Sequence, residues 1–304
     1  FATSEHGNIF DFVMKTQNLK FGEAVKHLAQ LAGMQPYMFS KQDEEREKKW
    51  KEYSSIFNQY VNFYHEQLLK NEEYTSARNY LKNRSLDKDQ VKKFKIGYIE
   101  KNPNFFEELK KDFSLESLIE TGLFYLDEKK KIYVERFRGR LIFPINNISG
   151  QPIALGGRII EKSDYLAKYI NSPETNFFKK GSNLYNLDSA RKLSNKLNNI
   201  YLVEGYMDVV GLSKNGIENA VANLGTSLTD KQIITLNQFF DDIVICFDGD
   251  ESGYKAALRA AENSIRDLKP EKQISFLFLP TNEDPDSFVN KNGKNFFLDF
   301  SKQS

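Results

Sequence analysis

VICFDGDESGYKAA, residues 244–257, joins an apolar stretch directly to two aspartates that are one residue apart. The apolar part has the composition of a buried strand, and the part after the acids has that of a helix. Without a partner, the charges of Asp248 and Asp250 repel each other, and the repulsion grows where water is excluded. The two acids therefore form either a solvated turn or a site for a cation.

The sequence around this stretch alternates between short apolar runs and amphipathic segments. Strands are expected at 200–205, 220–225, 242–248 and 273–280, with helices at 206–216, 228–240 and 251–268 between them. Strands that are separated by helices predict a parallel sheet that is covered on both faces.

Five acidic side chains follow the strands of this predicted sheet. Glu204 ends the first strand, Asp248 and Asp250 follow the third, and Asp284 and Asp286 follow the fourth. In open α/β sheets, ligands bind beyond the carboxyl ends of the strands. Carboxylate oxygens at one rim suit Mg²⁺, which shares its coordination shell with waters and substrate phosphates. The acids therefore predict a divalent-metal site rather than a simple turn.

Composition and charge narrow the function classes. The 304 residues are 40% hydrophobic and 28% charged, as in an ordinary globular protein, and no apolar run is long enough to span a membrane. The one cysteine, Cys246, lies in an apolar run and is expected to be a reduced core residue. Residues 131–195 hold 11 Lys/Arg and 5 Asp/Glu, a balance of +6, whereas residues 196–304 hold 11 and 16, a balance of −5. This polarity favours a polyanion on the first section and a cation on the second.

The first 160 residues are expected to be helical and then stranded. Residues 7–33 predict an amphipathic helix that Gly33 ends, 50–84 have helical spacing, and 85–94 predict a short helix with Ser85 as its N-cap. Residues 131–160 contain β-branched runs broken by turn residues, which predict strands.

Basic residues of the middle section are candidates for nucleic-acid contacts. Arg136, Arg138 and Arg140 alternate, so on one strand they would share a face that follows phosphates. The alternative is an edge strand that charged side chains protect from pairing.

A second basic group follows two glycines, which would let the backbone approach closely to Arg158. Lys168, Tyr169 and Asn171 place a charge, a stacking ring and an amide within four residues, a combination that suits single-stranded template. Lys180, in KKG, is a further candidate for nucleotide phosphate or template. Tyr185 is expected in the core.

The motifs that carry these residues resemble a known family. VEGYMDVV (203–210), ANLGTSLT (222–229), CFDGDESG (246–253) and EDPDSF (283–288) resemble the Toprim domain of bacterial DNA primases of the DnaG type. FRGRLIFPI, ALGGR and KYINSPETNFFKKGSNLYN resemble the basic nucleic-acid and nucleotide-handling subdomain of that family. The resemblance extends from GNIFDFVM to the last residue.

The resemblance implies an α/β fold: a Toprim domain with a mainly parallel sheet flanked by helices, preceded by a mixed α+β basic subdomain and N-terminal helices. It places a zinc-ribbon remnant and linker at 1–45, the basic nucleic-acid and nucleotide-binding subdomain at 46–195 and the Toprim catalytic domain at 196–304. The implied activity is synthesis of short RNA primers on single-stranded DNA from ribonucleoside triphosphates, with Mg²⁺ or Mn²⁺. It makes Glu204, Asp248 and Asp250 the principal catalytic and metal site, with Asp208, Asp284 and Asp286 as supporting acids, and it strengthens Lys168 and Lys180 as contacts.

The resemblance also implies partners and a location. The core is expected to act as a monomer in the bacterial cytoplasm at the replication fork, and the replicative helicase is expected to bind a C-terminal domain that this sequence does not contain. Structural zinc belongs to the family's N-terminal ribbon. Thr3 stands where the last cysteine of that ribbon is expected, so this sequence is not expected to bind zinc.

Two alternatives share the acidic motifs. One is a Toprim enzyme that cleaves DNA, such as a topoisomerase or nuclease, and the other is a non-enzymatic DNA-binding member of the family. FRGRLIFPI and NSPET favour the primase, and the presence of Glu204 together with both acids of the DGD motif argues against a protein without activity.

Overall fold

The computed structural model describes residues 9–19, 21–34, 40–161, 163–225, 228–247, 249, 270–281 and 283–302. The chain forms two compact units, residues 1–49 and 50–304. Among the described residues, no helix is both long and apolar enough to cross a membrane.

The first unit contains two short helices in place of the single helix expected over 7–33, so that prediction is wrong. Helix α1 spans Ile9–Gln17 and α2 spans Phe21–Leu31. Asn18 has a φ of 51°, and the N–H of Leu19 donates to the carbonyl of Met14 at 3.0 Å. Asparagine is one of the few residues that adopt this left-handed conformation, and it ends the helix there.

The longest helix, α3, spans Lys41–Lys70 and buries a stripe of aromatic rings in the second unit. Tyr53, Phe57, Tyr60 and Tyr64 are buried. Their spacing of three or four residues places them on one helix face, as helical periodicity requires.

Short helices follow α3. They are the 3₁₀ turn η1 (Glu72–Tyr74), α4 (Thr75–Asn83), α5 (Lys88–Lys93), α6 (Phe105–Leu109) and α7 (Leu115–Glu120). The prediction of Ser85 as an N-cap is wrong. Asp87 caps α5 instead, because its carboxylate accepts from the N–H groups of Asp89 and Gln90 at 2.9 and 3.0 Å.

An antiparallel sheet forms the middle of the second unit. Its strands are β1 (Gly97–Ile99), β4 (Arg140–Asn146), β5 (Pro152–Ile159) and β6 (Tyr169–Asn171), in the spatial order β1-β4-β5-β6. A separate hairpin pairs β2 (Phe124–Asp127) with β3 (Ile132–Glu135).

A buried carboxylate ties this hairpin to two helices. One oxygen of Glu135 accepts from the hydroxyls of Tyr60 and Tyr64 at 2.6 and 2.7 Å, and the other accepts from the N–H groups of Phe105 and Phe106 at 3.1 and 3.3 Å. Burial raises the pKa of Glu135, while these hydrogen bonds lower it.

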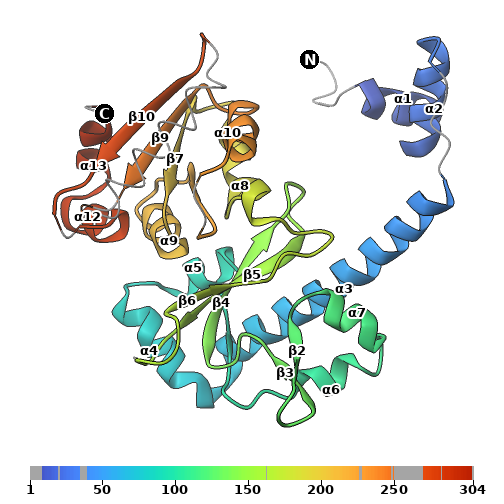
Figure 1. The fold of residues 1–304 in the computed structure, drawn as a ribbon. Helices are drawn as coiled ribbons and strands as arrows, with labels where there is room; N and C mark the ends of the chain where they lie inside the picture. The colour runs from blue at the N-terminus through green and yellow to red at the C-terminus, as the bar shows by residue number, and fades with distance from the viewer. Residues whose placement is uncertain are drawn as a thin grey trace. The chain divides into compact units, whose positions relative to one another are not determined.

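The predicted parallel sheet is present in the last third of the chain. Its strands are β7 (Asn199–Val203), β8 (Ala220–Ala222), β9 (Asp242–Phe247) and β10 (Gln273–Phe278), all parallel, in the spatial order β10-β9-β7-β8 (Figure 1). The other elements here are η2 (Lys180–Ser182), α8 (Leu187–Ala190), η3 (Arg191–Leu193), α9 (Tyr206–Lys214), α10 (Asp230–Asn237), α12 (Pro285–Asn292) and α13 (Lys294–Ser301).

Helices cover both faces of this sheet, as expected. Val209 of α9, Phe288 of α12 and Phe297 of α13 pack in one core with Tyr201 and Val244 of the strands. Leu187 of α8 and Leu236 of α10 pack in the opposite core with strand residues such as Ile243. The helix expected at 251–268 lies outside the described residues. The α/β fold class is confirmed.

Candidate active site

Glu204 lies at the carboxyl end of β7, as predicted, and its side chain is exposed. The next residue, Gly205, is the N-cap of α9, and its N–H donates to Asp208 at 3.0 Å. Asp208 is buried in the first turn of α9. Its carboxylate therefore fixes the turn that carries Glu204, because an acid at this position satisfies a backbone N–H that the helix leaves unbonded.

Two of the three acids of the EDPDSF motif, Asp284 and Asp286, lie at the start of α12. Asp284 is the N-cap and accepts from the N–H of Ser287 at 2.7 Å. Asp286 is buried against α9, where a Cβ at Gly211 would lie 2.2 Å from its Oδ1, and it accepts from the amide of Asn290 at 2.6 Å. Burial, and then the nearby charge of Asp284, raise the pKa of Asp286. Asp284 thus caps α12 and Asp286 packs α12 against α9, so both acids have structural contacts at the rim.

Asp248 and Asp250 lie outside the described residues. Phe247 and Gly249, which precede and follow Asp248 in the sequence, are described. Phe247 ends β9, which is directly beside β7, and the N–H of Gly249 donates to the carbonyl of Glu283 at 3.2 Å, just before α12. The carboxyl ends of two adjacent parallel strands and the start of α12 therefore share one rim.

The described part of the rim does not form a metal site by itself. Across the described ranges, no three acids, histidines or cysteines lie close enough to hold a metal ion. Asp208 and Asp284 each use an oxygen to cap a helix. Glu204 is exposed directly after β7.

Arg158 is the centre of the basic side of the site. It is buried, and its guanidinium carbon lies 5.4 Å from the ring centroid of Tyr80 and 5.0 Å from that of Tyr169. It also bonds to the Tyr169 hydroxyl, while its Nε has no hydrogen-bond partner among the described residues. Within the same residues no carboxylate forms an ion pair with Arg158, and its charge lies beside the two aromatic rings.

The two glycines before Arg158 have a different role from the one expected. A Cβ at Gly156 would lie 2.4 Å from the Tyr206 ring, and a Cβ at Gly157 would lie 2.5 Å from Phe137. The glycines admit these two aromatic rings to the sheet, which corrects the prediction that they bring the backbone close to the arginine.

Lys168 and Tyr169 lie at an exposed edge. Lys168 precedes β6, and its Nζ is 5.7 Å from the ring centroid of Tyr169. Burial raises the pKa of Tyr169 to about 12, although the charge of Arg158 opposes this. Tyr169 is therefore a neutral, partly exposed ring beside a cation, and it can stack on a base.

The side chain of Asn171 is turned to the protein at both ends. Its amide nitrogen donates to the carbonyl of Leu224 at 2.8 Å, and its oxygen accepts from the Tyr206 hydroxyl. Lys180, in contrast, is bonded through its backbone: its N–H donates to Glu174 at 3.1 Å, and its carbonyl accepts from Gln232 at 3.1 Å.

Arg136, Arg138 and Arg140 do not share a strand face, so that prediction is wrong. Strand β3 ends at Glu135 and β4 begins at Arg140, with a turn between them. Arg136 donates to the carbonyl of Gly122 at 2.8 Å, and Arg140 is buried and donates to the carbonyl of Lys168 at 3.3 Å. Arg138 is exposed.

Two residues of the site were not found from the sequence. Tyr80 and Arg84 lie on α4 and at its C-cap, and a guanidinium nitrogen of Arg84 lies 3.9 Å from Asp286. Their spacing of four residues on a helix was the only signal, and it does not distinguish a binding face from a solvated one.

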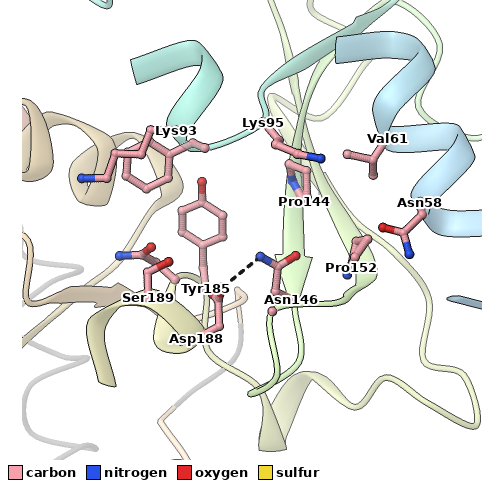
Figure 2. Close-up of a pocket in the computed structure, with 13 residues that line it drawn as sticks. Asn58, Val61, Lys93, Lys95, Pro144, Asn146, Pro152, Tyr185, Asp188 and Ser189 are labelled. Carbon is pink, nitrogen blue, oxygen red and sulfur yellow. Dashed lines mark hydrogen bonds between the residues drawn. The ribbon is translucent and has the colours of Figure 1, made fainter. Parts of the chain in front are cut away.

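A cavity of about 200 Å³ lies apart from these acids, between α3, the end of α5, β4 and the segment before α8 (Figure 2). Asp188 is its one carboxylate, and that carboxylate accepts from Asn146 at 3.1 Å. Tyr185 is buried there, as expected, and its hydroxyl has no partner among the described residues. One acid that is already bonded does not form a metal site, so the cavity is not the candidate active site.

Comparison with known proteins agrees with this geometry. Residues 63–191 match the DNA primase catalytic core, N-terminal domain, and residues 198–278 match the Toprim domain. A crystal structure of a DNA primase domain from Pseudomonas aeruginosa is 38% identical, with a TM-score of 0.78 over 83% of this chain and 78% of that one. The chain belongs to the DnaG-type DNA primase catalytic-core family.

Other relatives of the DnaG type are equally similar. A DnaG primase catalytic domain bound to single-stranded DNA is 35% identical, with a TM-score of 0.77, and the match covers 84% of this chain and 82% of that one. The DNA primase of Haemophilus influenzae is 36% identical over 99% of this chain and 51% of the relative. That of Escherichia coli is 36% identical over 98% of this chain and 51% of the relative. The chain thus spans about half the length of these curated DNA primases.

Proposed function

We propose that this chain is the catalytic core of a primase, a DNA-directed RNA polymerase that makes short RNA primers on single-stranded DNA during replication. The observation that carries the proposal is the meeting of two charged surfaces in one compact unit. Arg84 lies 3.9 Å from Asp286 at the acid-bearing rim, and the guanidinium carbons of Arg84 and Arg158 lie 6.0 and 5.4 Å from the same ring centroid, that of Tyr80. An acidic rim that would bind a metal cation, beside the arginine of β5, suits the transfer of a nucleotidyl group, because both positive charges would stabilise the reacting phosphates.

The basic residues would hold the nucleic acid and the nucleotide. Arg158 and Lys168 would bind phosphate, and Tyr169 would stack on a base. Arg138, which is exposed, and Lys180, whose backbone is fixed, are further candidates for phosphate contacts. One structural relative, a DnaG primase catalytic domain, has single-stranded DNA bound, which supports this class of ligand. The hydrogen bond from Arg136 to the carbonyl of Gly122 and the burial of Arg140 make structural roles the better proposal for those two.

Glu204, with Asp248 and Asp250 from the adjacent strand end, would hold Mg²⁺ or Mn²⁺. The metal, when bound, would supply charge neutralisation at the reacting phosphates. Glu204 would ligate it from a turn that Asp208 fixes, and Asp284 and Asp286 would keep α12 against that rim. Transfer of a nucleotidyl group needs positioning more than a protein nucleophile.

The wider setting is also a proposal. The division into parts at 1–45, 46–195 and 196–304, action as a monomer, a cytoplasmic location at the replication fork and helicase binding through a C-terminal part all rest on the family resemblance. So does the expectation that zinc belongs only to an N-terminal ribbon of the family.

Primer synthesis on single-stranded DNA, with ribonucleoside triphosphates and with or without Mg²⁺, tests the proposal. We expect RNA products that require Mg²⁺ and that Glu204→Gln abolishes. Glu271→Gln, an exposed acid changed in the same way, is the matched control and should retain activity. A DNA-cleaving enzyme would instead nick or relax a plasmid, and a non-enzymatic member would bind DNA without incorporating nucleotides.

A further inference from the structure

The Asn171 side chain connects β6 to two loops at the rim of the parallel sheet. Its amide nitrogen donates to the carbonyl of Leu224 at 2.8 Å, in the loop after β8, and its oxygen accepts from the hydroxyl of Tyr206, the first residue of α9. Because one end donates and the other accepts, each end of the amide has the partner that suits it. The Asn171 side chain therefore links β6, the strand that also carries Tyr169, to the start of α9, which follows Glu204.

Tyr206 is held from the other side by packing. Its ring stacks on Phe143 with centroids 5.5 Å apart, and it meets Tyr185 edge-on at 4.9 Å. The absence of a side chain at Gly156 gives the ring its place, because a Cβ there would lie 2.4 Å from it. The amide oxygen of Asn171 can only accept, so the Tyr206 hydroxyl donates this hydrogen bond.

We propose that Asn171 and Tyr206 are positioning residues. Their hydrogen bond fixes the turn that carries Glu204 relative to β6, the β-strand that is proposed to contact the DNA template. Neither side chain contacts the nucleic acid. The proposal rests on the proposed primer synthesis, because it assigns Glu204 to the metal and β6 to the template. It replaces the expectation that the Asn171 amide reads the template, since both ends of that amide have protein partners.

Three variants separate the parts of this link. Tyr206→Phe removes only the hydroxyl that Asn171 accepts from. Asn171→Asp keeps an acceptor for Tyr206 but loses the donor to Leu224, and Asn171→Ala removes both bonds. Tyr185→Phe is the matched control, because it removes a buried tyrosine hydroxyl that has no partner among the described residues, next to the same ring.

Three measurements are made on each variant: kcat for primer synthesis, affinity for single-stranded DNA across a salt series, and Mn²⁺ affinity by electron paramagnetic resonance. We expect Tyr206→Phe to lower kcat and weaken Mn²⁺ binding by about five- to tenfold each, the effect of one neutral hydrogen bond. Its DNA affinity and salt slope should match those of the wild type. Combining Tyr206→Phe with Asn171→Ala should cost no more than Asn171→Ala alone.

Other outcomes overturn the proposal. If Asn171→Ala weakens DNA binding while Tyr206→Phe does not, Asn171 contacts the template directly. If Tyr206→Phe only lowers Tm, or if Tyr185→Phe has the same effects, the link is an ordinary packing contact. The Mn²⁺ measurement also distinguishes a failure of the positioning proposal from a failure of the proposed function. A wild-type protein that binds Mn²⁺ but makes no RNA would refute the proposed function. The link would then still be judged by whether Tyr206→Phe weakens Mn²⁺ binding.

Discussion

Arg158 and Tyr169 are direct cross-strand partners on β5 and β6, and the guanidinium carbon of Arg158 lies 5.0 Å from the ring centroid of Tyr169. The arginine is buried and the tyrosine is partly exposed. The pair therefore presents the ring of Tyr169 to solvent, with the charge of Arg158 behind it. In this arrangement the ring would stack on a base and the positive charge would attract the phosphate of the same nucleotide.

Lys168 tests the phosphate contact without disturbing the core, because its side chain is exposed. Lys168→Ala should weaken binding to single-stranded DNA of any sequence and should lower the slope of log affinity against log salt by about 0.7, the value for one phosphate contact on a single strand. Fluorescence-anisotropy titrations across a salt series measure both quantities. Lys111→Ala, an exposed lysine that pairs with Glu108 at 2.7 Å, is the control and should leave the slope unchanged. An unchanged slope for Lys168→Ala would place the template elsewhere.

Tyr169 should behave differently, because a stacking ring carries no charge. Tyr169→Ala should lower affinity for single-stranded DNA by roughly 1–3 kcal/mol, with nearly the same salt slope as the wild type. Tyr169→Phe keeps the ring and loses only the bond to Arg158, so it should retain most of the affinity. Equal losses in the two variants would show that the hydroxyl, and not stacking, is what binding requires.

Gly156 should not tolerate a side chain, because a Cβ there would overlap the Tyr206 ring. Gly156→Ala should destabilise the protein by about 1–3 kcal/mol, as overpacking of a core does, and should lower primer synthesis through Tyr206. Gly22→Ala is the opposite control: this helical glycine has open space around it, so alanine should stabilise α2 by up to about 1 kcal/mol. Thermal unfolding should show a lower Tm than the wild type for Gly156→Ala and a higher Tm for Gly22→Ala.

Glu135 predicts a pH dependence of stability. Its pKa is raised by burial, so the folded chain holds this proton more tightly than the unfolded chain, whose reference pKa is 4.5. The stabilisation from this group is therefore fully present below that reference pKa and is lost as pH rises through the raised value. Glu135→Gln cannot ionise, so its Tm relative to that of the wild type should rise between pH 4 and pH 7. A constant difference across this range would show that the pKa of Glu135 is not raised.

The parallel sheet and its acid-bearing rim could be predicted because each strand is a short apolar run and amphipathic segments separate these runs in the sequence. Glu204 and Asp284 stand where that pattern places them, at the end of β7 and at the start of α12. The basic residues of the site were harder to predict. Arginines at every second position over 136–140 share a strand face only if no turn lies within that segment. Gly139, with a φ of 71°, lies in the turn that separates β3 from β4.

The positioning contacts could not be predicted from local patterns. Arg84 and Asp286 are about two hundred residues apart in the chain, and only the packing of α12 on α9 and the placement of α4 bring them to 3.9 Å. The same holds for Asn171 and Tyr206, whose bond depends on the space that Gly156 leaves. Such pairs depend on tertiary packing, which cannot be predicted from the hydrophobic periodicity of the sequence.

The most direct test of the central claim is ribonucleotide incorporation on single-stranded DNA by the wild type and by Glu204→Gln, at equal folded concentration and with Mg²⁺. The rim-based account predicts RNA products from the wild type and none from the variant, with DNA affinity the same for both because Glu204 lies on the metal side of the site. Normal RNA synthesis by Glu204→Gln, or no RNA from a folded wild type that binds single-stranded DNA, would contradict it.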